Sequence, residues 1–426
     1  MARQRSARRR KPAVSARTGA AVLLGIAAAG CDDGVSPPPG PGPVTIAGTR
    51  SATGSLSLEG MNMARGIELA VKMLNDAGGI DGRDVRIILL DDESEPARAA
   101  DLYRELVAAD SIDLLIGPYA SSITSAVVPV AEAAGRPLVT PQAASHRIWS
   151  GQGRSWSVQM LNDARHNLAG AVVVGARLGA ETAALVYEDS SFPASAAEGV
   201  RAAAAVEGLT LVMDESYPVG GADHGELVSR ARDLGADLFL GGGYTQDAVA
   251  FATAVAQAEY DPVLSSWSVG PGQPDFPDSV GIDAARCVVG NTPWVASLRT
   301  SGLLATAAMF VLPYREEYDA DPGDTAAAGF GAIELLAEAA RASVASHGEI
   351  ADAVVRDYLF STSTRTVLGP YGVVPLGDPN AGSQRLLVRL QVQWQDDGQG
   401  GLVQRVIYPD RAAEAEACTT GPTPSQ

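Results

Sequence analysis

The sequence predicts an α/β fold of two doubly wound parallel-sheet lobes joined by a three-segment hinge. A chain of 426 residues with 46% hydrophobic content is long enough for more than one core. From residue 44 onward, short apolar strands alternate with helical stretches, which is typical of parallel sheets covered by helices. A similar strand followed by a glycine turn also occurs twice, as DLLIGPYASS at 113–122 and as DLFLGGGYTQ at 237–246. The repeat indicates two lobes of one architecture.

The first lobe begins with three strand-helix-strand steps. Short apolar runs predict strands at 44–49, 84–92, 112–117 and 136–141. Apolar residues at helical spacing predict helices at 63–78, 96–110 and 122–135. The first of these helices stops at a Gly-Gly pair, residues 78 and 79.

The second lobe repeats the alternation. Helices are expected at 167–179, 194–208, 224–235 and 246–258, and strands at 182–189, 209–217, 236–243 and 262–267. Residues 113–141 and 237–266 match element for element, with Pro137 and Pro262 opening the last strand of each segment. Each lobe therefore presents the carboxyl end of an equivalent strand.

The remaining chain is expected to return to the first lobe and then to finish in the second. Helices are predicted at 302–318, 325–343 and 348–361, and a hairpin with a glycine turn at 385–409. Passages near Asn162, Asn291 and Val374 predict a hinge that lets the lobes close without unfolding. The expected division is 44–161 with 292–373 for lobe 1, 162–291 with 374–412 for lobe 2, and a flexible tail at 413–426.

The first thirty residues have the composition of a secretory leader. They hold seven basic residues and no acidic one, followed by an apolar run too short to span a bilayer permanently. The AAAG before Cys31 resembles a lipobox, although Ala28 stands where a large aliphatic residue is usual. We expect a signal peptide at 1–30, lipidation of Cys31 and a Pro/Gly tether at 31–43. The alternative is an ordinary cleavage site with an incidental cysteine.

Charge and cysteines restrict the possible partners. Removing the leader moves the net charge from −18 to −25, which disfavours nucleic acid because its binding needs clustered Lys and Arg. In an oxidising compartment Cys287 and Cys418 could form a disulfide. The alternative is one buried and one exposed thiol. The sequence does not decide between the disulfide and the two free thiols.

The candidate site lies where the repeated strands end. In open parallel sheets, ligands bind outside the carboxyl ends of the strands, where loops and helix amino termini converge. Two facing lobes would bring the groups at these ends to one small molecule. The groups are those of Tyr119, Ser121, Ser122, Tyr244 and Thr245. The alternative is that the hydroxyls only cap the following helices.

The order and spacing of five segments resemble the type 1 periplasmic solute-binding proteins, specifically the leucine/isoleucine/valine-binding family of branched-chain amino-acid transporters. The segments are GIELAVKMLNDAGGIDGR, DDESEPARAADLYRELV, DLLIGPYASS, GRPLVTPQAAS and YREEYDADPGDTAAAGFGAIELLAEA. The similarity runs from residue 44 to about residue 409. It implies a Venus-flytrap fold and a ligand held between the lobes.

The resemblance also implies site residues. In that family, groups corresponding to Ser121 and to the segment 142–144, with Ala143 and Ala144, grip the ligand's α-carboxylate and α-ammonium. The family's usual Thr falls at Ala144, so a hydroxyl is missing unless Ser145 substitutes. From the second lobe, the resemblance implies contacts from Phe192 and Tyr244.

One departure from the family concerns the ammonium partner. The family's acidic residue aligns near Trp267, and a buried ammonium without a carboxylate partner is costly. Glu59 could supply a replacement charge, or could simply be solvated in its loop. Alternatively Phe192, Trp267, Tyr244 and Tyr119 could line a more aromatic pocket, or Trp267 could pack under the hinge.

No motif in the sequence indicates catalysis, a cofactor or a metal. Walker A, G-x-S-x-G and H-E-x-x-H motifs are missing, and the four histidines are scattered. A hydrolase would need a base beside a nucleophile, and no histidine can be placed beside Ser121.

We therefore expect a monomeric, extracytoplasmic, membrane-anchored lipoprotein that is not an enzyme. It would capture a small amino acid, amide or related carboxylate and deliver it to the permease subunits of an ABC importer. The alternative is a lipoprotein that senses the same ligand and signals to a membrane partner.

Overall fold

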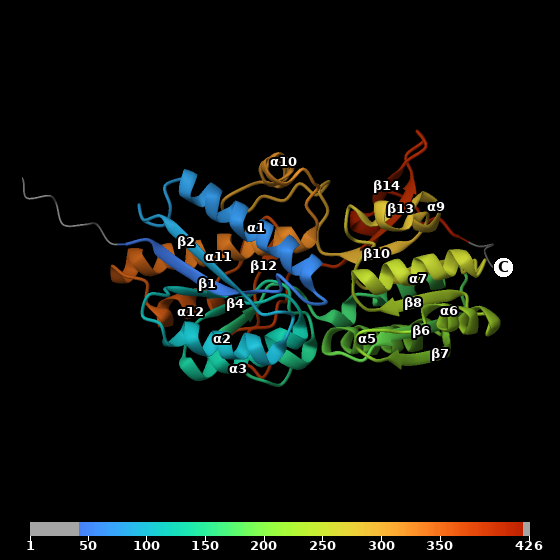
Figure 1. The fold of residues 1–426 in the computed structure, drawn as a ribbon, viewed down its shortest axis with the longest axis horizontal. Helices are drawn as coiled ribbons and strands as arrows, with labels where there is room; N and C mark the ends of the chain where they lie inside the picture. Colours follow the sequence, from blue (N-terminus) through green and yellow to red (C-terminus); the bar gives the residue numbers. More distant parts are fainter. Residues whose placement is uncertain (1–41, 421–426) are drawn as a thin grey trace, which may run out of the picture. The chain divides into compact units, whose positions relative to one another are not determined.

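Two β-sheets organise residues 42–420, the part of the chain that this computed structural model describes (Figure 1). The first has five strands in the order β2-β1-β3-β4-β5, and the second has seven in the order β14-β13-β10-β9-β8-β6-β7. The strands of the first sheet are β1 (Val44–Arg50), β2 (Val85–Asp91), β3 (Leu114–Ile116), β4 (Leu138–Thr140) and β5 (Ser157–Gln159). Those of the second are β6 (Thr182–Glu188), β7 (Thr210–Tyr217), β8 (Leu238–Gly242), β9 (Leu264–Trp267), β10 (Val289–Thr292), β13 (Leu390–Asp396) and β14 (Leu402–Tyr408). A separate ribbon pairs β11 (Thr364–Thr366) with β12 (Gly369–Tyr371).

The two sheets share one winding order. The order β2-β1-β3-β4-β5 is matched strand for strand by β7-β6-β8-β9-β10. The repeated segments 113–122 and 237–246 fall on β3 and β8, which stand next to the first strand of each sheet, where the winding reverses. This reversal opens a crevice outside the strand ends. The predicted pair of similar α/β lobes is confirmed.

The second sheet is mixed rather than purely parallel. β13 pairs antiparallel with β10, and β14 pairs antiparallel with β13, so the predicted terminal hairpin is confirmed and completes the sheet. The structure differs from the expectation of parallel lobes here because a tight hairpin can join only antiparallel strands. β13 therefore covers the edge that β10 would otherwise expose.

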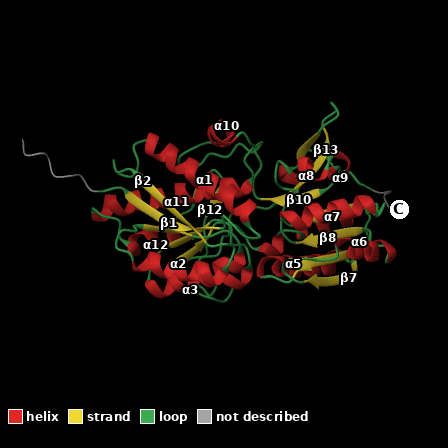
Figure 2. Ribbon diagram, viewed as in Figure 1, coloured by secondary structure: helices red, strands yellow, loops and turns green. Residues whose placement is uncertain are grey.

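Helices cover the sheets in pairs (Figure 2). We call the five-stranded sheet and the helices packed on it the first lobe, and the seven-stranded sheet with its helices the second lobe. Helices of the first lobe are α1 (Ser57–Asp76), α2 (Pro96–Ala108), α3 (Ser121–Ala134), α10 (Ala307–Tyr318), α11 (Asp324–His347) and α12 (Asp352–Ser361). Helices of the second lobe are α4 (Ala169–Arg177), α5 (Ser191–Glu207), α6 (His224–Asp233), α7 (Thr245–Gln257), α8 (Phe276–Val280) and α9 (Ile282–Ala285). Short 3-10 helices are η1 (His146–Ile148), η2 (Ala164–His166) and η3 (Asp410–Ala412).

Alternate residues of the second sheet enter different cores. Ala183 and Leu185 of β6 pack with α4 and α5, whereas Ala184 and Val186 pack with α6 and α7. Successive side chains of a strand point to opposite faces, so a continuous apolar run supplies both cores. The chain passes between the two sheets three times, after β5, after β10 and after β12.

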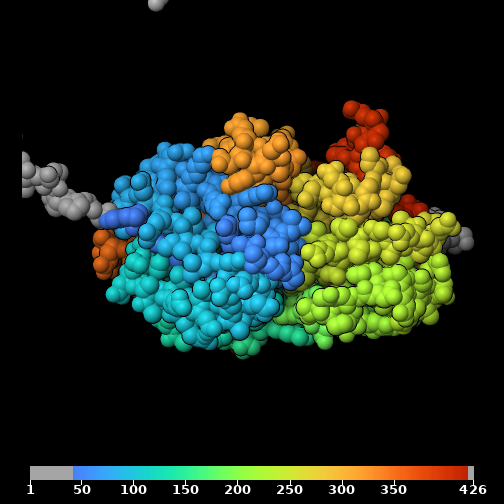
Figure 3. Space-filling model, in the orientation of Figure 1, coloured from blue at the N-terminus to red at the C-terminus, as the bar shows by residue number. Residues whose placement is uncertain are grey.

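Two glycines let α1 and α11 pack against each other with their backbones close together. A Cβ on Gly66 would lie 1.9 Å from the carbonyl oxygen of Ala326, and one on Gly329 would lie 2.4 Å from that of Met63. Helix α10 also packs beside α1, and its surface is the orange region next to the blue one in Figure 3. The first lobe therefore depends on small residues at one helix crossing.

The carboxyl-terminal segment is fastened to the second lobe. Cys287 and Cys418 form a disulfide with a Cα–Cα distance of 5.6 Å. The side-chain amide of Gln393 donates to the carbonyl oxygens of both cysteines and accepts from the Cys418 amide. The first part of the expected flexible tail, 413–420, is thus bonded to β13, while 421–426 lie outside the described residues. The expected leader at 1–30, Cys31 and all but the last two residues of the tether also lie outside them.

None of the helices between residues 42 and 420 is long and apolar enough to cross a membrane.

Buried Glu334 of α11 holds the loop that precedes α10. Its carboxylate accepts from the backbone amides of Leu304, Ala305 and Val367, at 2.8, 3.1 and 2.6 Å. Burial outweighs these bonds and raises the pKa of Glu334 to about 7.

We expect Gly66→Ala to lower the free energy of unfolding by about 1–3 kcal/mol, because the new methyl group would meet backbone rather than a movable side chain. Gly225→Ala in α6 is the control, since its Cβ would meet nothing closer than 3.6 Å. Urea denaturation followed by circular dichroism measures both variants. Equal stability of the two would contradict the close approach of α1 and α11.

We expect Glu334 to make the protein less stable as pH rises. Its raised pKa means that the folded protein binds the proton more tightly than the unfolded chain, so its contribution is complete below pH 4.5 and is lost as pH rises through about 7. The loss amounts to roughly 3 kcal/mol. Unfolding free energies at acidic and mildly alkaline pH should differ less in Glu334→Gln than in the wild type. Glu338→Gln, on the same helix, should keep the wild-type difference.

Candidate functional site

The turn after β3 places Ser121 at the carboxyl edge of the first sheet. Ala120 takes a positive φ of 69°, a conformation that non-glycine residues rarely adopt, and Ser121 then starts α3. The Ser121 hydroxyl oxygen accepts from the amides of Ala144 and Ser145, at 3.1 and 3.0 Å. Both amides are therefore already bonded to Ser121, including that of Ala144, which belongs to the segment that the resemblance implied would contact the ligand.

The turn after β8 supplies the opposing wall. Asp247 accepts a hydrogen bond from the Tyr244 amide and so fixes the start of α7, while the Ser268 hydroxyl bonds the backbone of Gly243. The ring of Tyr244 meets that of Phe192 with centroids 5.9 Å apart and that of Tyr119 at 6.5 Å. Aromatic rings from both lobes thus meet between the repeated strand ends.

A small cavity of about 40 Å³ lies between these turns. One water molecule needs about 10–15 Å³ on this measure, so the cavity has room for about three water-sized groups while the lobes are in contact. Its walls come from both lobes and from the segment that precedes β13. The lining residues are Tyr119, Ala120, Ser121, Gln142, Ala144, Leu161, Asn167, Phe192, Tyr244, Ser268, Val269, Gly270, Gly272, Gln273, Asn291, Asp324, Thr325 and Arg389.

Two buried side chains of opposite charge line this cavity. Arg389 is 8% exposed, and its Nε donates to Asn162 Oδ1 at 2.7 Å. Asp324, at the start of α11, is also 8% exposed and accepts from Gln273 Nε2 at 2.6 Å. Among residues 42–420 no carboxylate lies within 4 Å of the Arg389 guanidinium. Arg389 and Asp324 can each therefore bind an oppositely charged group of a ligand.

The titration of the two groups reflects their burial. Burial lowers the pKa of Arg389 to about 10, although the negative charge of Asp324 opposes the change. Burial likewise raises the pKa of Asp324, against the positive charge of Arg389 and the hydrogen bond from Gln273. A ligand that brought a carboxylate to Arg389 and a cation to Asp324 would favour the charged form of both.

Buried polar atoms without a partner gather around the same cavity. Gln142 Nε2, Asn167 Oδ1, the Tyr244 hydroxyl and Asn291 Oδ1 all lack a hydrogen-bond partner among the described residues. Buried polar atoms in native proteins are rarely left unpaired, so such a cluster indicates a site for a polar molecule. Within the described chain no three His, Cys, Asp or Glu side chains are grouped to hold a metal ion.

The structure brings five of the predicted site residues to the cavity and leaves four away from it. Tyr119, Ser121, Ala144, Phe192 and Tyr244 line the cavity. Ser122, Ala143, Trp267 and Glu59 do not. Ser122 is half-buried on α3, and the Ala143 carbonyl accepts from Trp149 and Gln159 inside the first lobe. Ser145, considered as a substitute hydroxyl, bonds Ser195 and Ser191 instead.

Trp267 packs inside the second lobe. Its ring lies edge-on to Phe239 at 6.3 Å and directly over Gly241, where a Cβ would come within 2.3 Å of it. The next residue, Ser268, lines the cavity instead, because successive side chains at a strand end point to opposite sides. The Trp267 ring therefore packs against other residues of the second lobe and does not line the cavity.

Glu59 connects the two lobes. It is 4% exposed, in the first turn of α1, and its Oε1 accepts from the backbone amide of Thr245 at 3.2 Å. Burial raises the pKa of Glu59. The possibility of a solvated loop acid is wrong, and the carboxylate contacts the start of α7 beside the cavity rather than the cavity itself.

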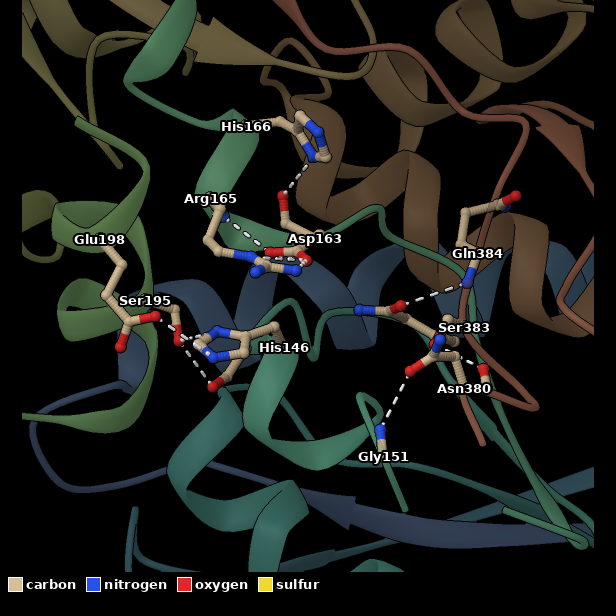
Figure 4. Close-up of polar contacts among 12 residues, drawn as sticks. His146, Gly151, Asp163, Arg165, His166, Ser195, Glu198, Asn380, Ser383 and Gln384 are labelled. Carbon is tan, nitrogen blue, oxygen red and sulfur yellow. Dashed lines mark hydrogen bonds and ion pairs between the residues drawn. The ribbon is translucent and has the colours of Figure 1, made fainter. Parts of the chain in front are cut away.

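A second polar contact joins the lobes at the surface. In Figure 4 the His146 ring faces Ser195 and Glu198. Its Nδ1 lies 3.2 Å from the Ser195 hydroxyl and its Nε2 lies 3.3 Å from Glu198 Oε2. Arg147 also reaches Glu198, at 2.7 Å. These bonds connect η1 of the first lobe with α5 of the second.

The charged residues of the cavity were missed from the sequence. Asp324 was interpreted as part of a turn between helices, and Arg389 as one residue of an alternating strand. The available signal for Arg389 was its position inside the apolar run LLVRLQV, since an arginine among core residues is rarely buried without a partner. Gln273 and Asn291 carried no comparable signal.

Comparisons with known proteins show the family and the fold of the chain. A family profile described as periplasmic binding protein matches residues 43–390. The Leu/Ile/Val-binding protein homolog 8 of Brucella abortus (strain 2308) is 29% identical over 382 residues, which cover 85% of this chain and 90% of the relative.

Two solved structures share the fold. The branched-chain amino acid transporter substrate binding protein LivJ of Streptococcus pneumoniae, in complex with isoleucine, superimposes with a TM-score of 0.71 at 21% identity, covering 86% of this chain and all of LivJ. An ABC transporter solute binding protein of Rhodopseudomonas palustris BisB5, in complex with 3,4-dihydroxybenzoic acid, gives 0.73 at 19% identity, covering 88% and 98%. The chain belongs to the periplasmic binding protein family, whose members bind solutes, and its relatives include the Leu/Ile/Val-binding proteins.

Proposed function

We propose that the protein is an extracytoplasmic solute-binding lipoprotein of an ABC importer, anchored through Cys31. The observation that carries the proposal is the cavity between β3 and β8, where buried Arg389 and Asp324 and four unpartnered polar atoms meet. Such a concentration of unsatisfied groups is costly unless a polar molecule joins it. Neither a covalent step nor a cofactor is part of the proposal.

The ligand that fits is small and carries a carboxylate. Arg389 can pair with the carboxylate, and the Ser121 and Gln142 side chains can donate to it. Asp324 and the Asn291 carbonyl can accept from an ammonium or amide at the other end of the solute. Asp324 thereby supplies the acidic group that the sequence lacks near Trp267. A small amino acid, amide or related carboxylate matches this distribution of donors and acceptors.

Capture would couple binding to closure of the lobes. The bonds from Glu59 to Thr245, from Gln273 to Asp324 and from His146 to Glu198 all join one lobe to the other. A solute larger than the 40 Å³ cavity can enter only if these contacts open. The ligand would favour the closed form only by its greater affinity for that form.

Delivery to a permease is the remaining step of the proposal. Cells that lack the protein should fail to accumulate the radiolabelled ligand and should recover uptake with the wild-type gene. Cells complemented with Cys31→Ser should recover less, because the protein is no longer held at the membrane. Normal uptake in the deleted strain, with a lost transcriptional response to the ligand, would favour the sensing alternative.

We expect both charged ends of a leucine-like solute to contribute to the stabilisation of the protein. Thermal unfolding of the full chain carrying Cys31→Ser would be followed with leucine, leucinamide, 4-methylpentanoate and 3,4-dihydroxybenzoate. A ligand at a hundred times its Kd adds about 2.7 kcal/mol. Asp324→Asn should reduce the leucine shift more than the 4-methylpentanoate shift, whereas the exposed Asp319→Asn should change neither. Ligand shifts that survive both Asp324→Asn and Arg389→Gln would contradict the assignment of the cavity.

We expect Ser121→Ala and Tyr244→Phe to separate stability from binding. Ser121→Ala leaves two buried amides without an acceptor and should cost about 1–3 kcal/mol of folding free energy, even without ligand. Tyr244→Phe removes a hydroxyl that has no partner among the described residues, so it should weaken ligand binding and leave the melting temperature of the ligand-free protein nearly unchanged. Ser122→Ala is the control for Ser121. Equal melting temperatures of Ser121→Ala and Ser122→Ala would contradict the bonding of the turn.

A further inference from the structure

A second and larger groove lies where the chain crosses between the lobes. Its volume is about 790 Å³, within the ~300–1,000 Å³ of small-molecule sites. Its walls are formed by residues 162–173, by the carboxyl-terminal half of α5, by the segment 384–391 and by residues 408–411. Figure 4 shows Asp163, Arg165, His166 and Gln384 from two of these walls. The repeated strand ends do not contribute to the groove.

The inside of the groove is mostly apolar. Val173 of α4, Ala203 and Val206 of α5, and Leu387 and Val388 of the crossing segment all line it. Val206 is 82% exposed and Val388 is 36% exposed. Covering these side chains with a hydrocarbon body would remove apolar surface from water, at about 25 cal/mol per Å².

The rim of the groove is positively charged. Arg385 and Arg411 are exposed, and among the described residues neither has a carboxylate within 4 Å. Arg165 is paired with Asp163 at 2.6 Å, and Arg177 is paired with Asp410, whereas Glu207 lines the groove and has no cation within 4 Å among the described residues. Exposed Arg385 and Arg411, with buried Arg389 at the groove wall, thus outnumber the carboxylate of Glu207 and can receive an anion, on a chain whose net charge is −18.

One buried polar atom of a residue that lines the groove has no hydrogen-bond partner among the described residues. Gln391 is 1% exposed and lines the groove, and its Nε2 donates to the carbonyl of Asn167 at 3.0 Å. Its Oε1 has no partner among the described residues. A bound molecule with a hydroxyl or amide N–H can donate to this oxygen.

We propose that the groove is a second binding site, for an amphipathic carboxylate that carries an apolar chain and a hydroxyl or amide N–H. The carboxylate pairs with Arg385 and Arg411, the chain covers Val173 and Val206, and the donor meets Gln391 Oε1. This ligand is longer and more apolar than the solute of the small cavity. The groove shares Arg389 with the small cavity, but the second site does not rest on the proposed transport function.

Isothermal titration with 3-hydroxydecanoate and its uncharged methyl ester tests the proposal on the full chain carrying Cys31→Ser. We expect the acid to bind at least tenfold more tightly than the ester. Arg385→Glu combined with Arg411→Glu should weaken the acid at least tenfold, and Val206→Glu should weaken it at an exposed position that the fold does not need. Arg405→Glu, which reverses an exposed charge on β14 outside the groove, is the matched control and should bind normally.

Several outcomes would overturn the second site. These are no binding at millimolar acid, equal binding of the ester, or equal weakening by Arg405→Glu. Loss of binding in Asp324→Asn would place the acid in the small cavity instead. Sedimentation with phosphatidylglycerol vesicles, lost in the double variant while the free acid does not bind, would assign the groove to a membrane surface. A failure of the leucine experiment leaves this test unaffected, since Arg389 lines both sites but the variants of this test change only Arg385, Arg411 and Val206.

Discussion

The reversal of winding beside β1 and β6 is the constraint on which the arrangement depends. In each sheet the helices that follow the two neighbouring strands, β1 and β3 or β6 and β8, leave on opposite faces, so no helix covers the crevice between these strand ends. The turns there must satisfy their backbone groups locally, which Ser121 does for two amides and Ser268 for Gly243. The cavity exists because two such uncovered edges meet, and its polar lining follows from the hydrogen bonds that those edges need.

The elements that could be predicted from the sequence are those with a local pattern of apolar residues. Apolar runs and helical periodicity indicated the strands and helices of both lobes, and the repeat at 113–122 and 237–246 indicated that the lobes are alike. The short strands β5 (SVQ) and β10 (VGNT) were not predicted, because their polar residues and glycine leave no apolar run, whereas the equally short β3 (LLI) and β4 (LVT) lie in apolar runs. The disulfide stayed undecided, since the bonds that hold the tail near Cys287, such as those of Gln393 to Cys418 and of Gln395 to Glu416, join residues far apart in the sequence.

The candidate site was predictable only where it follows directly from a strand end. Tyr119, Ser121 and Tyr244 follow β3 and β8, so topology alone places them at the cavity. Arg389 and Asp324 reach it from segments far along the chain, and no spacing rule connects them. Trp267 was misplaced because an alignment locates a residue along a strand without fixing the face to which its side chain points. Burial of opposite charges, rather than order in the sequence, defines the centre of the site.

The hairpin of β13 and β14 has a consequence for how the protein folds. The second sheet cannot be completed until residues 390–408 have joined β10, although its other strands end by residue 292. Contacts between such distant parts of a chain are slow to form, because a long loop must close first. During synthesis, which begins at the amino terminus, the edge of β10 would therefore stay unpaired until β13 and β14 have been made. During that interval the half-made lobe is exposed to strand pairing with other chains, and chaperones that bind extended segments would protect it.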